Sequence, residues 1–276
     1  MDKLFRGEYL PSLADKVLVH YDRLYCDPST IENGDTVYCD THHVAKYKHV
    51  LTKKQNLKII THNSDYYICE ENPWNECGVD VRDFENCFDY WFGQNSFCKT
   101  QNVIPLPIGF ENLRWEKAFG PKTEWLQEIR NEKIDPDQQV YLNCNRHTNR
   151  LERHLCYKYC SGVDFVTCDA PNLRYRDYLR QIKRHRFTIS PEGNGLDCHR
   201  TWEIFMMERV PVIKRKGSLE RLYGHMPVLF VDNWEDLEQI DFENVYNSLI
   251  SRFKNQHTLF LHFNTWSKNY YESLFT

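Results

Sequence analysis

The sequence predicts an α/β fold with two successive series of strands and helices and mainly parallel sheets. Short apolar runs alternate with helical stretches along the 276 residues, which is the pattern of parallel strands joined by crossover helices. A polar stretch that contains proline, residues 131–137, separates the two series. A strand, a loop with two glycines and a helix follow one another over residues 187–203, an arrangement suited to binding phosphate groups.

The first series opens with the apolar run KVLVH and contains five predicted strands. They are residues 16–20, 36–39, 57–61, 89–92 and 103–106. Asp40 can cap a helix over residues 42–51. Residues 70–85 are rich in Asn and Asp and predict a loop.

The second series follows two exposed helical stretches, residues 115–119 and 124–132. Its predicted strands are residues 140–143, 165–167, 186–190, 211–214 and 228–231, and its helices include residues 150–160 and 173–184. The chain ends in an aromatic, amphipathic segment. We therefore expect an N-terminal α/β domain over residues 1–135, a second over residues 136–255, and a closing segment over residues 256–276.

Composition limits the classes of function. The net charge of −4 argues against binding nucleic acid over a large surface. No apolar run has the length of a membrane span, and the first residues do not resemble a secretory signal. The 11 cysteines are scattered and lack the paired spacing of zinc sites, so we expect free thiols and a cytoplasmic protein.

The glycine loop and the helix after it predict a nucleotide-diphosphate site. The helix N-terminus offers unpaired N–H groups, and Arg200 adds a permanently charged fork. Glu203 lies one turn further and can accept hydrogen bonds from the two hydroxyls of a ribose. The alternative is an ordinary strand–turn–helix with a surface arginine. The predicted binding residues are Ser190, Glu192, Gly193, Asn194, Gly195, His199, Arg200 and Glu203.

A second basic cluster follows the strand at residues 140–143. It contains Arg146, Thr148, Arg150 and Arg153. Positive charge at the start of a helix is electrostatically unfavourable, so this cluster predicts a bound anion. The alternative is a solvated basic helix start. Two cationic clusters can replace a metal ion, and no Asp-x-Asp motif follows a strand, so we expect a metal-independent reaction.

The ends of the first-series strands are where a general base is expected. Asp65 and His62 follow the strand at residues 57–61, and either could accept a proton from a hydroxyl group. The alternative for each is a surface polar residue or a turn former. His20 and Asp22 follow the first strand in the same way. Trp74 and Trp115 could line a groove for a sugar.

Several segments resemble exostosin-like glycosyltransferases, family 47 and its relatives. Residues 200–214 resemble the family's Arg-x-x-Glu helix and the apolar-Pro-Val-apolar strand after it, although Glu208 stands where the family usually has glycine. Residues 219–223 and 227–234 resemble its next helix and strand, and residues 105–112 resemble its P-x-P-I-G-x-x-N segment. Thr148 and Arg153 fit a T-x-x-x-x-R pattern. The small size is similar to that of compact virus-encoded members.

The resemblance implies a GT-B-like fold, in which two Rossmann-like α/β domains face a cleft and the C-terminal helix crosses back to the first domain. It implies an inverting transferase that moves a sugar, with xylose as one candidate, from a UDP-sugar donor to the hydroxyl of an oligosaccharide or glycoprotein glycan, without a further cofactor. A non-catalytic nucleotide- or glycan-binding module is the alternative. A dinucleotide-dependent oxidoreductase is disfavoured because the Gly-x-Gly-x-x-Gly fingerprint is missing.

Overall fold

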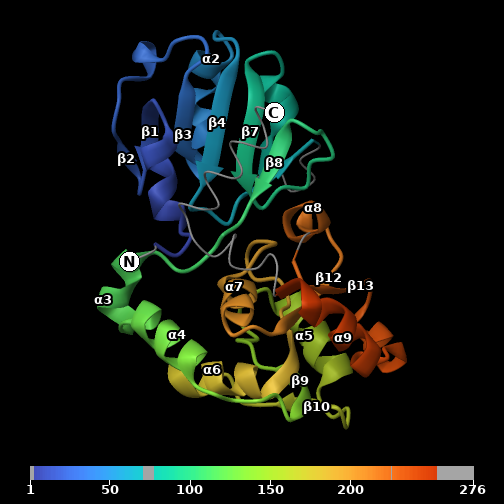
Figure 1. The fold of residues 1–276 in the computed structure, drawn as a ribbon. Coiled ribbons are helices and arrows are strands. Elements are labelled where there is room, and N and C mark those ends of the chain that lie inside the picture. The colour runs from blue at the N-terminus through green and yellow to red at the C-terminus, as the bar shows by residue number, and fades with distance from the viewer. Residues whose placement is uncertain (1–2, 71–77, 225, 254–276) are drawn as a thin grey trace.

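The computed structural model describes residues 3–70, 78–224 and 226–253 and contains two larger sheets (Figure 1). All strand pairs of these sheets are parallel except β1–β2. The prediction of a mixed α/β fold with mainly parallel sheets is therefore confirmed.

The first sheet has the order β2-β1-β3-β4-β7-β8. Its strands are β1 Lys16–His20, β2 Arg23–Leu24, β3 Thr36–Asp40, β4 Leu57–His62, β7 Phe88–Gln94 and β8 Val103–Leu106. Each parallel strand lies beside the one before it along the chain, so the order never reverses among these strands. Side chains alternate between two cores: Val37 and Cys39 face one, and Tyr38 faces the other.

Two predictions in the first series are wrong in detail. Residues 42–51 form α1 Thr41–Val44 and α2 Lys48–Leu51, with a 3-10 turn Ala45–Tyr47 between them. Asp40 makes no cap with its side chain, which instead accepts a hydrogen bond from the Tyr38 hydroxyl at 2.9 Å. The predicted loop over residues 70–85 contains β6 Gly78–Asp80, which pairs with β5 Tyr67–Cys69, and a 3-10 helix Val81–Phe84. Val79 and Phe84 are buried in the core, which accounts for the regular structure of a segment predicted as a loop.

The segment between the sheets contains α3 Glu116–Phe119 and α4 Lys122–Asn131. Leu126 and Ile129 of α4 belong to the same core as the second sheet. The ammonium of Lys183, on α6 Tyr175–Arg184, donates to the carbonyls of Ile129 and Arg130 at 3.1 and 2.8 Å. α4 therefore packs with the core of the second sheet.

The second sheet has the order β10-β9-β11-β12-β13. Its strands are β9 Gln138–Leu142, β10 Val166–Cys168, β11 His185–Ile189, β12 Val210–Lys214 and β13 Leu229–Val231. The helices are α5 Arg150–Cys160, α6, α7 His199–Met206, α8 Leu219–Tyr223 and α9 Phe242–Phe253. The chain first adds a strand on one side of β9 and then continues on the other. In α/β sheets such a reversal creates a crevice at the carboxyl ends of the strands, where ligands bind.

The turn between α7 and β12 contains Glu208, which stands where the exostosin-like pattern has glycine. Glu208 has φ +59°, the left-handed conformation that glycine adopts most easily. Arg130 of α4 forms an ion pair with the Glu208 carboxylate at 3.5 Å. The turn thus has a conformation suited to glycine without a glycine.

Some predictions concern residues outside the described part of the chain. They are the C-terminal helix over residues 256–276 and the groove residue Trp74. Within the described part, none of the helices combines the length and apolar character needed to cross a bilayer. Every cysteine there is a free thiol.

Candidate functional site

A cavity of about 480 Å³ lies at the place in the second sheet where the order of the strands reverses. Asn143 and Asn145 reach it from the end of β9, and the glycine loop reaches it from the end of β11. Asp65, Ile108 and Glu111 line it from the first half of the chain. Its size lies within the range of pockets that hold small ligands and cofactors. The cavity is therefore built from the carboxyl ends of strands in both halves.

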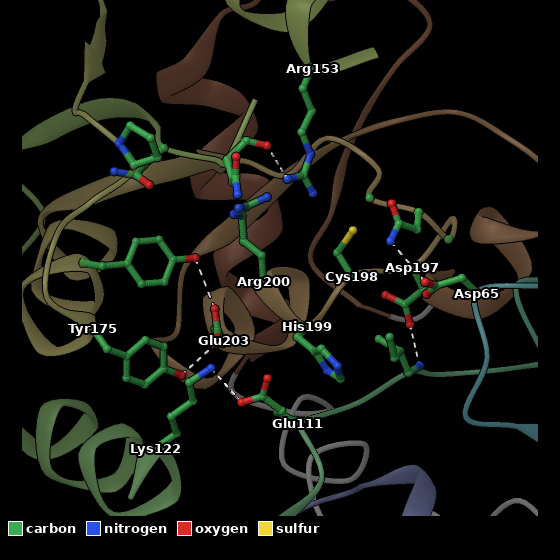
Figure 2. Close-up of a pocket in the computed structure, with 18 of the residues that line it drawn as sticks. Asp65, Glu111, Lys122, Arg153, Tyr175, Asp197, Cys198, His199, Arg200 and Glu203 are labelled. Carbon is green, nitrogen blue, oxygen red and sulfur yellow. Dashed lines mark hydrogen bonds and ion pairs between the residues drawn. The ribbon is translucent and has the colours of Figure 1, made fainter. Parts of the chain in front are cut away.

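Two arginines face this cavity without a carboxylate partner among the described residues (Figure 2). Arg153 is only 6% exposed, and its guanidinium donates to the carbonyls of Glu192 and Asn145 at 3.0 and 2.8 Å. The Nε and Nη1 atoms of Arg200 are buried and have no hydrogen-bond partner there. Burial, followed by the like charge of Arg200, lowers the pKa of Arg153. Two close cations without an ion pair among the described residues favour a negatively charged ligand.

The start of α7 adds to this positive field. Its N-cap residue is Cys198, and no side chain among the described residues caps the helix. Uncapped N–H groups at a helix N-terminus attract anions. Arg200 belongs to the same first turn. The electrostatics of the cavity therefore favour an anionic ligand.

The glycine loop is held by a residue that the sequence did not indicate. The Asn95 side-chain oxygen accepts hydrogen bonds from the Leu196 and Asp197 amides at 3.0 and 3.3 Å. A Cβ atom on Gly195 would lie 2.5 Å from Asn95, so glycine is needed there for this contact, and Gly195 also lines the cavity. A Cβ atom on Gly193 would lie 3.3 Å from the Arg153 guanidinium. Gly193 and Asn194 line the cavity and remain available to a ligand.

Glu203 lies on the wall of the cavity between two tyrosines. Its two carboxylate oxygens accept hydrogen bonds from the hydroxyls of Tyr175 and Tyr178, at 2.7 and 3.2 Å (Figure 2). Lys122 and Glu111 form an ion pair of 2.6 Å nearby, and both line the cavity. The two tyrosines were not predicted from the sequence, although their spacing of three residues places both on one face of α6.

Other predicted binding residues lie outside the residues that line the cavity. Arg146 and Arg150 are exposed, and Arg146 packs over the Tyr157 ring at 5.1 Å. Thr148 is half-buried, and its amide hydrogen bonds to the Asn145 carbonyl at 3.4 Å. Of the basic cluster, the structure brings only Arg153 to the cavity.

Ser190 and Glu192 are held by the protein itself. The Ser190 hydroxyl lies 2.9 Å from the Thr201 hydroxyl, and the Glu192 carboxylate lies 2.7 Å from the Lys216 ammonium. Both side chains are buried. These contacts hold β11 and the loop after it in position. Both residues therefore have a structural role at the site.

A second cavity, of about 280 Å³, adjoins the first. It shares Asp65, Ile108 and His199 with the first cavity. Its other walls include Arg114, which lies 3.6 Å over the Tyr21 ring, and Trp115, which is 42% exposed. An exposed indole beside a polar cavity offers a surface on which a sugar ring can pack.

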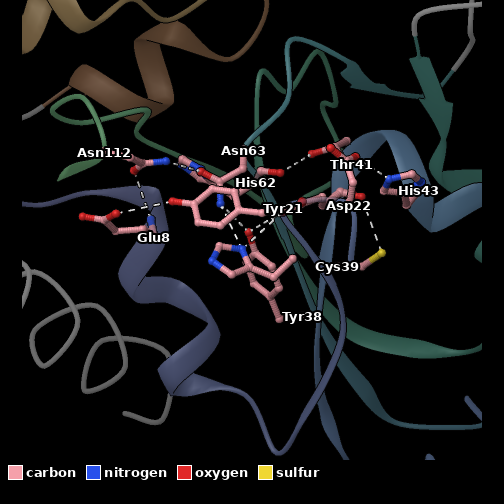
Figure 3. A network of polar contacts seen from close by, with 12 residues as sticks. Glu8, Tyr21, Asp22, Tyr38, Cys39, Thr41, His43, His62, Asn63 and Asn112 are labelled. Atoms are coloured by element: carbon pink, nitrogen blue, oxygen red, sulfur yellow. Dashed lines mark hydrogen bonds and ion pairs between the residues drawn. The ribbon is translucent and has the colours of Figure 1, made fainter. Parts of the chain in front are cut away.

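Two residues that line the second cavity, Asn63 and Asn112, belong to a hydrogen-bonded network (Figure 3). The Asn63 amide donates to the Tyr38 hydroxyl at 2.8 Å and accepts from the Asn112 side chain at 3.0 Å. Asn112 in turn accepts from the Glu8 amide at 3.2 Å. The members satisfy one another, so this network is explained as structure and needs no ligand.

The two predicted bases have different surroundings. Asp65 is exposed, and its carboxylate accepts a hydrogen bond from the Asn194 side chain at 3.1 Å. His62 is buried, and its Nε2 atom lies 2.8 Å from the Pro107 carbonyl. Burial lowers the pKa of His62 to about 4, which makes the imidazole a weak base.

Asp22, His42 and His43 form a separate group that could hold a metal ion. The Asp22 carboxylate lies 3.0 and 2.8 Å from the Nε2 atoms of the two histidines. These side chains hold the pKa of Asp22 down at about 2. Lys46 places its ammonium 2.9 Å from the other ring nitrogen of His43, an unfavourable neighbour for a metal-bound histidine. The group lies outside the linings of both cavities.

A scan of protein-family models finds no match to this chain, and a search of curated proteins also finds none.

Proposed function

We propose that this protein is a glycosyltransferase that moves a sugar from a nucleotide-diphosphate donor, a UDP-sugar, to a glycan hydroxyl. The observation that carries the proposal is the pair Arg153 and Arg200, which face one cavity without a carboxylate partner in the described chain. Burying a charge without compensation is costly, so such a pair is best explained by an anion that joins it.

The residues that line the cavity could bind both the diphosphate and the ribose of a nucleotide diphosphate. The diphosphate would lie against Arg153, Arg200 and the start of α7. The ribose would lie against Glu203, whose carboxylate retains lone pairs beyond those used by the two tyrosines. His199, Gly193 and Asn194 would line the path to the sugar.

The adjoining cavity would hold the acceptor. The two spaces meet at Asp65, Ile108 and His199, so a donor sugar and an acceptor hydroxyl could approach each other there. Fixed guanidinium groups would stabilise the leaving diphosphate in the role that a metal ion has elsewhere. This arrangement agrees with a GT-B-like pair of Rossmann-like domains and an inverting, metal-independent reaction. Xylose remains the first sugar to test.

Calorimetry with UDP, UMP and uridine tests the proposal. Because the arginines would hold the phosphates, affinity should fall in the order UDP, UMP, uridine, and added salt should weaken UDP most. Equal affinities for UDP and uridine would contradict it. A screen of radiolabelled UDP- and GDP-sugars with oligosaccharide acceptors then tests transfer. Tight UDP binding without transfer of any sugar would favour the alternative, a non-catalytic nucleotide- or glycan-binding module.

A further inference from the structure

We infer that His199 is the catalytic base, and that its Nε2 atom takes the proton from the acceptor hydroxyl. The inference rests on the proposed transfer reaction. Among the residues that line the two cavities, Asp65 and His199 are the titratable side chains common to both. A base must reach the acceptor hydroxyl while the donor sugar is present, so it must stand at this junction.

A hydrogen bond fixes the protonation of the His199 ring. Its Nδ1 atom lies 2.7 Å from the Gly109 carbonyl oxygen. A carbonyl can only accept, so Nδ1 carries the hydrogen and the neutral ring has its lone pair on Nε2. The same bond holds the ring in one orientation, as a positioning partner does in other catalytic histidines.

The Nε2 atom is open to the cavity. It has no hydrogen-bond partner in the described chain, and it is absent from the polar atoms sealed from solvent. Figure 2 shows the His199 ring extending into the space between Glu111 and Asp197, away from the Glu203 wall. A lone pair at this position can meet an acceptor hydroxyl.

His62 has the opposite arrangement. Its Nε2 atom donates to the Pro107 carbonyl, so its lone pair is on Nδ1. A Cβ atom on Gly7 would lie 2.1 Å from that Nδ1, which shows that the backbone of Gly7 covers it. The one nitrogen of His62 that could take a proton is therefore closed to a substrate.

Asp65 reaches the junction but has another contact. Its carboxylate accepts from Asn194 of the glycine loop and so links the two halves of the chain. It remains the main competing assignment because it lines both cavities.

The proposed step is balanced as a displacement. The acceptor oxygen forms a bond to the anomeric carbon of the donor sugar. The bond from that carbon to the β-phosphate oxygen breaks, and its electron pair leaves with the nucleoside diphosphate. The hydroxyl proton passes to Nε2 of His199, which becomes an imidazolium.

The tautomer can be measured on the whole protein, with UDP as the probe. Long-range ¹H–¹⁵N NMR of ¹⁵N-labelled protein, compared with His199→Asn for assignment, should show His199 protonated at Nδ1 and bare at Nε2, with a shift when UDP is added. A ring protonated at Nε2 at neutral pH would overturn the inference. Failure of UDP to bind wild-type protein would instead overturn the proposed function, and the base with it.

Kinetics then separate the candidate bases. In His199→Asn the amide can still donate to Gly109, so fold and UDP affinity should be kept. Turnover of the best UDP-sugar should fall on the order of 100-fold or more, and the acidic limb of the pH profile should disappear. The matched control is His154→Gln, an exposed histidine outside both cavities, which should behave as wild type. Loss of the acidic limb in Asp65→Asn, with the limb kept in His199→Asn, would assign the base to Asp65.

Discussion

The two sheets are both mainly parallel but differ in the order of their strands, and the difference coincides with where buried charges are left unsatisfied. The first sheet adds its parallel strands in one direction, whereas the second reverses at β9. Asn63 and Asn112, which line the second cavity, satisfy each other and the Tyr38 hydroxyl. At the reversal in the second sheet, Arg200 has buried nitrogens without a partner in the described residues. The first edge also has a buried polar atom without a partner among the described residues, the neutral Gln94 Oε1, whereas at the second edge the unpartnered atoms belong to a charged guanidinium, which we propose that a ligand completes.

Removing Arg200 should have the largest effect. In Arg200→Ala, turnover should fall on the order of 100-fold or more, because the guanidinium stabilises charge that develops on the leaving diphosphate. Affinity for UDP should fall less. Steady-state kinetics and calorimetry measure both, with exposed Arg146→Ala as the matched control. Normal turnover in Arg200→Ala would remove the charge-stabilising role.

Glu203→Ala should weaken UDP binding by about 2 kcal/mol, roughly 30-fold, through loss of a charged hydrogen-bond acceptor. Calorimetry measures the change, and far-UV circular dichroism checks the fold. Tyr175→Phe, which loses one of the two hydrogen bonds to Glu203, should have a smaller effect. Unchanged affinity in folded Glu203→Ala would place the ribose elsewhere.

Asn63→Ala should lower the stability of the protein without changing its affinity for UDP. Loss of the hydrogen bonds to Tyr38 and Asn112 should lower the free energy of unfolding by about 1–3 kcal/mol. UDP affinity should not change. Urea unfolding measures stability, with Asn33→Ala as a control that loses one exposed hydrogen bond. A loss of UDP affinity without a loss of stability would contradict the assignment of this network to structure.

The pH dependence of stability should have opposite signs at the two edges. Burial raises the pKa of Asp197 to about 6, so its contribution is present at low pH and is lost as pH rises through 6. The pKa of His62 falls from 6.5 to about 4, so its contribution is present above 6.5 and is lost as pH falls toward 4. In the wild type these two effects oppose each other between pH 4 and 6.

Single variants should therefore expose each contribution. With Asp197→Asn, the free energy of unfolding should fall more steeply than in wild type as pH decreases from 6.5 to 4. With His62→Gln, it should rise over the lower part of this range. Denaturant unfolding at several pH values measures both slopes. Parallel pH profiles in all three proteins would show that neither group has the stated shift.

The smallest expected effect is that of metal removal. Transfer should persist in excess EDTA, because fixed cations are proposed to act at the diphosphate. The group Asp22, His42 and His43 lies outside both cavities, so a metal there should not alter turnover. Loss of transfer in EDTA and its return with Mn²⁺ would contradict metal independence.

Much of the secondary structure could be predicted, because local patterns determine it. Apolar runs located the parallel strands of both larger sheets but not the short strand β2, and α5 begins and ends where its pattern predicts. The reversal at β9 could not be predicted, since a strand's apolar run does not reveal its neighbours. Arg150 and Arg153 look equivalent in sequence, but Arg153 is buried and its guanidinium donates to the carbonyls of Glu192 and Asn145. Asn95 lies about 100 residues from the loop it holds, so no local signal connects them.

Pro107, Ile108 and Gly109 form hydrogen bonds with both halves of the chain and so restrain how the halves can move. The Pro107 carbonyl accepts a hydrogen bond from His62, and the Gly109 carbonyl accepts one from His199. Between them, the Ile108 amide donates a hydrogen bond to Asp197 at 2.7 Å. One of these side chains belongs to the first half and two to the second. A displacement of one sheet past the other would break either the His62 bond or the two bonds to Asp197 and His199, because the segment cannot follow both halves. We therefore expect residues 107–109 to hold the His199 ring at the junction of the two cavities.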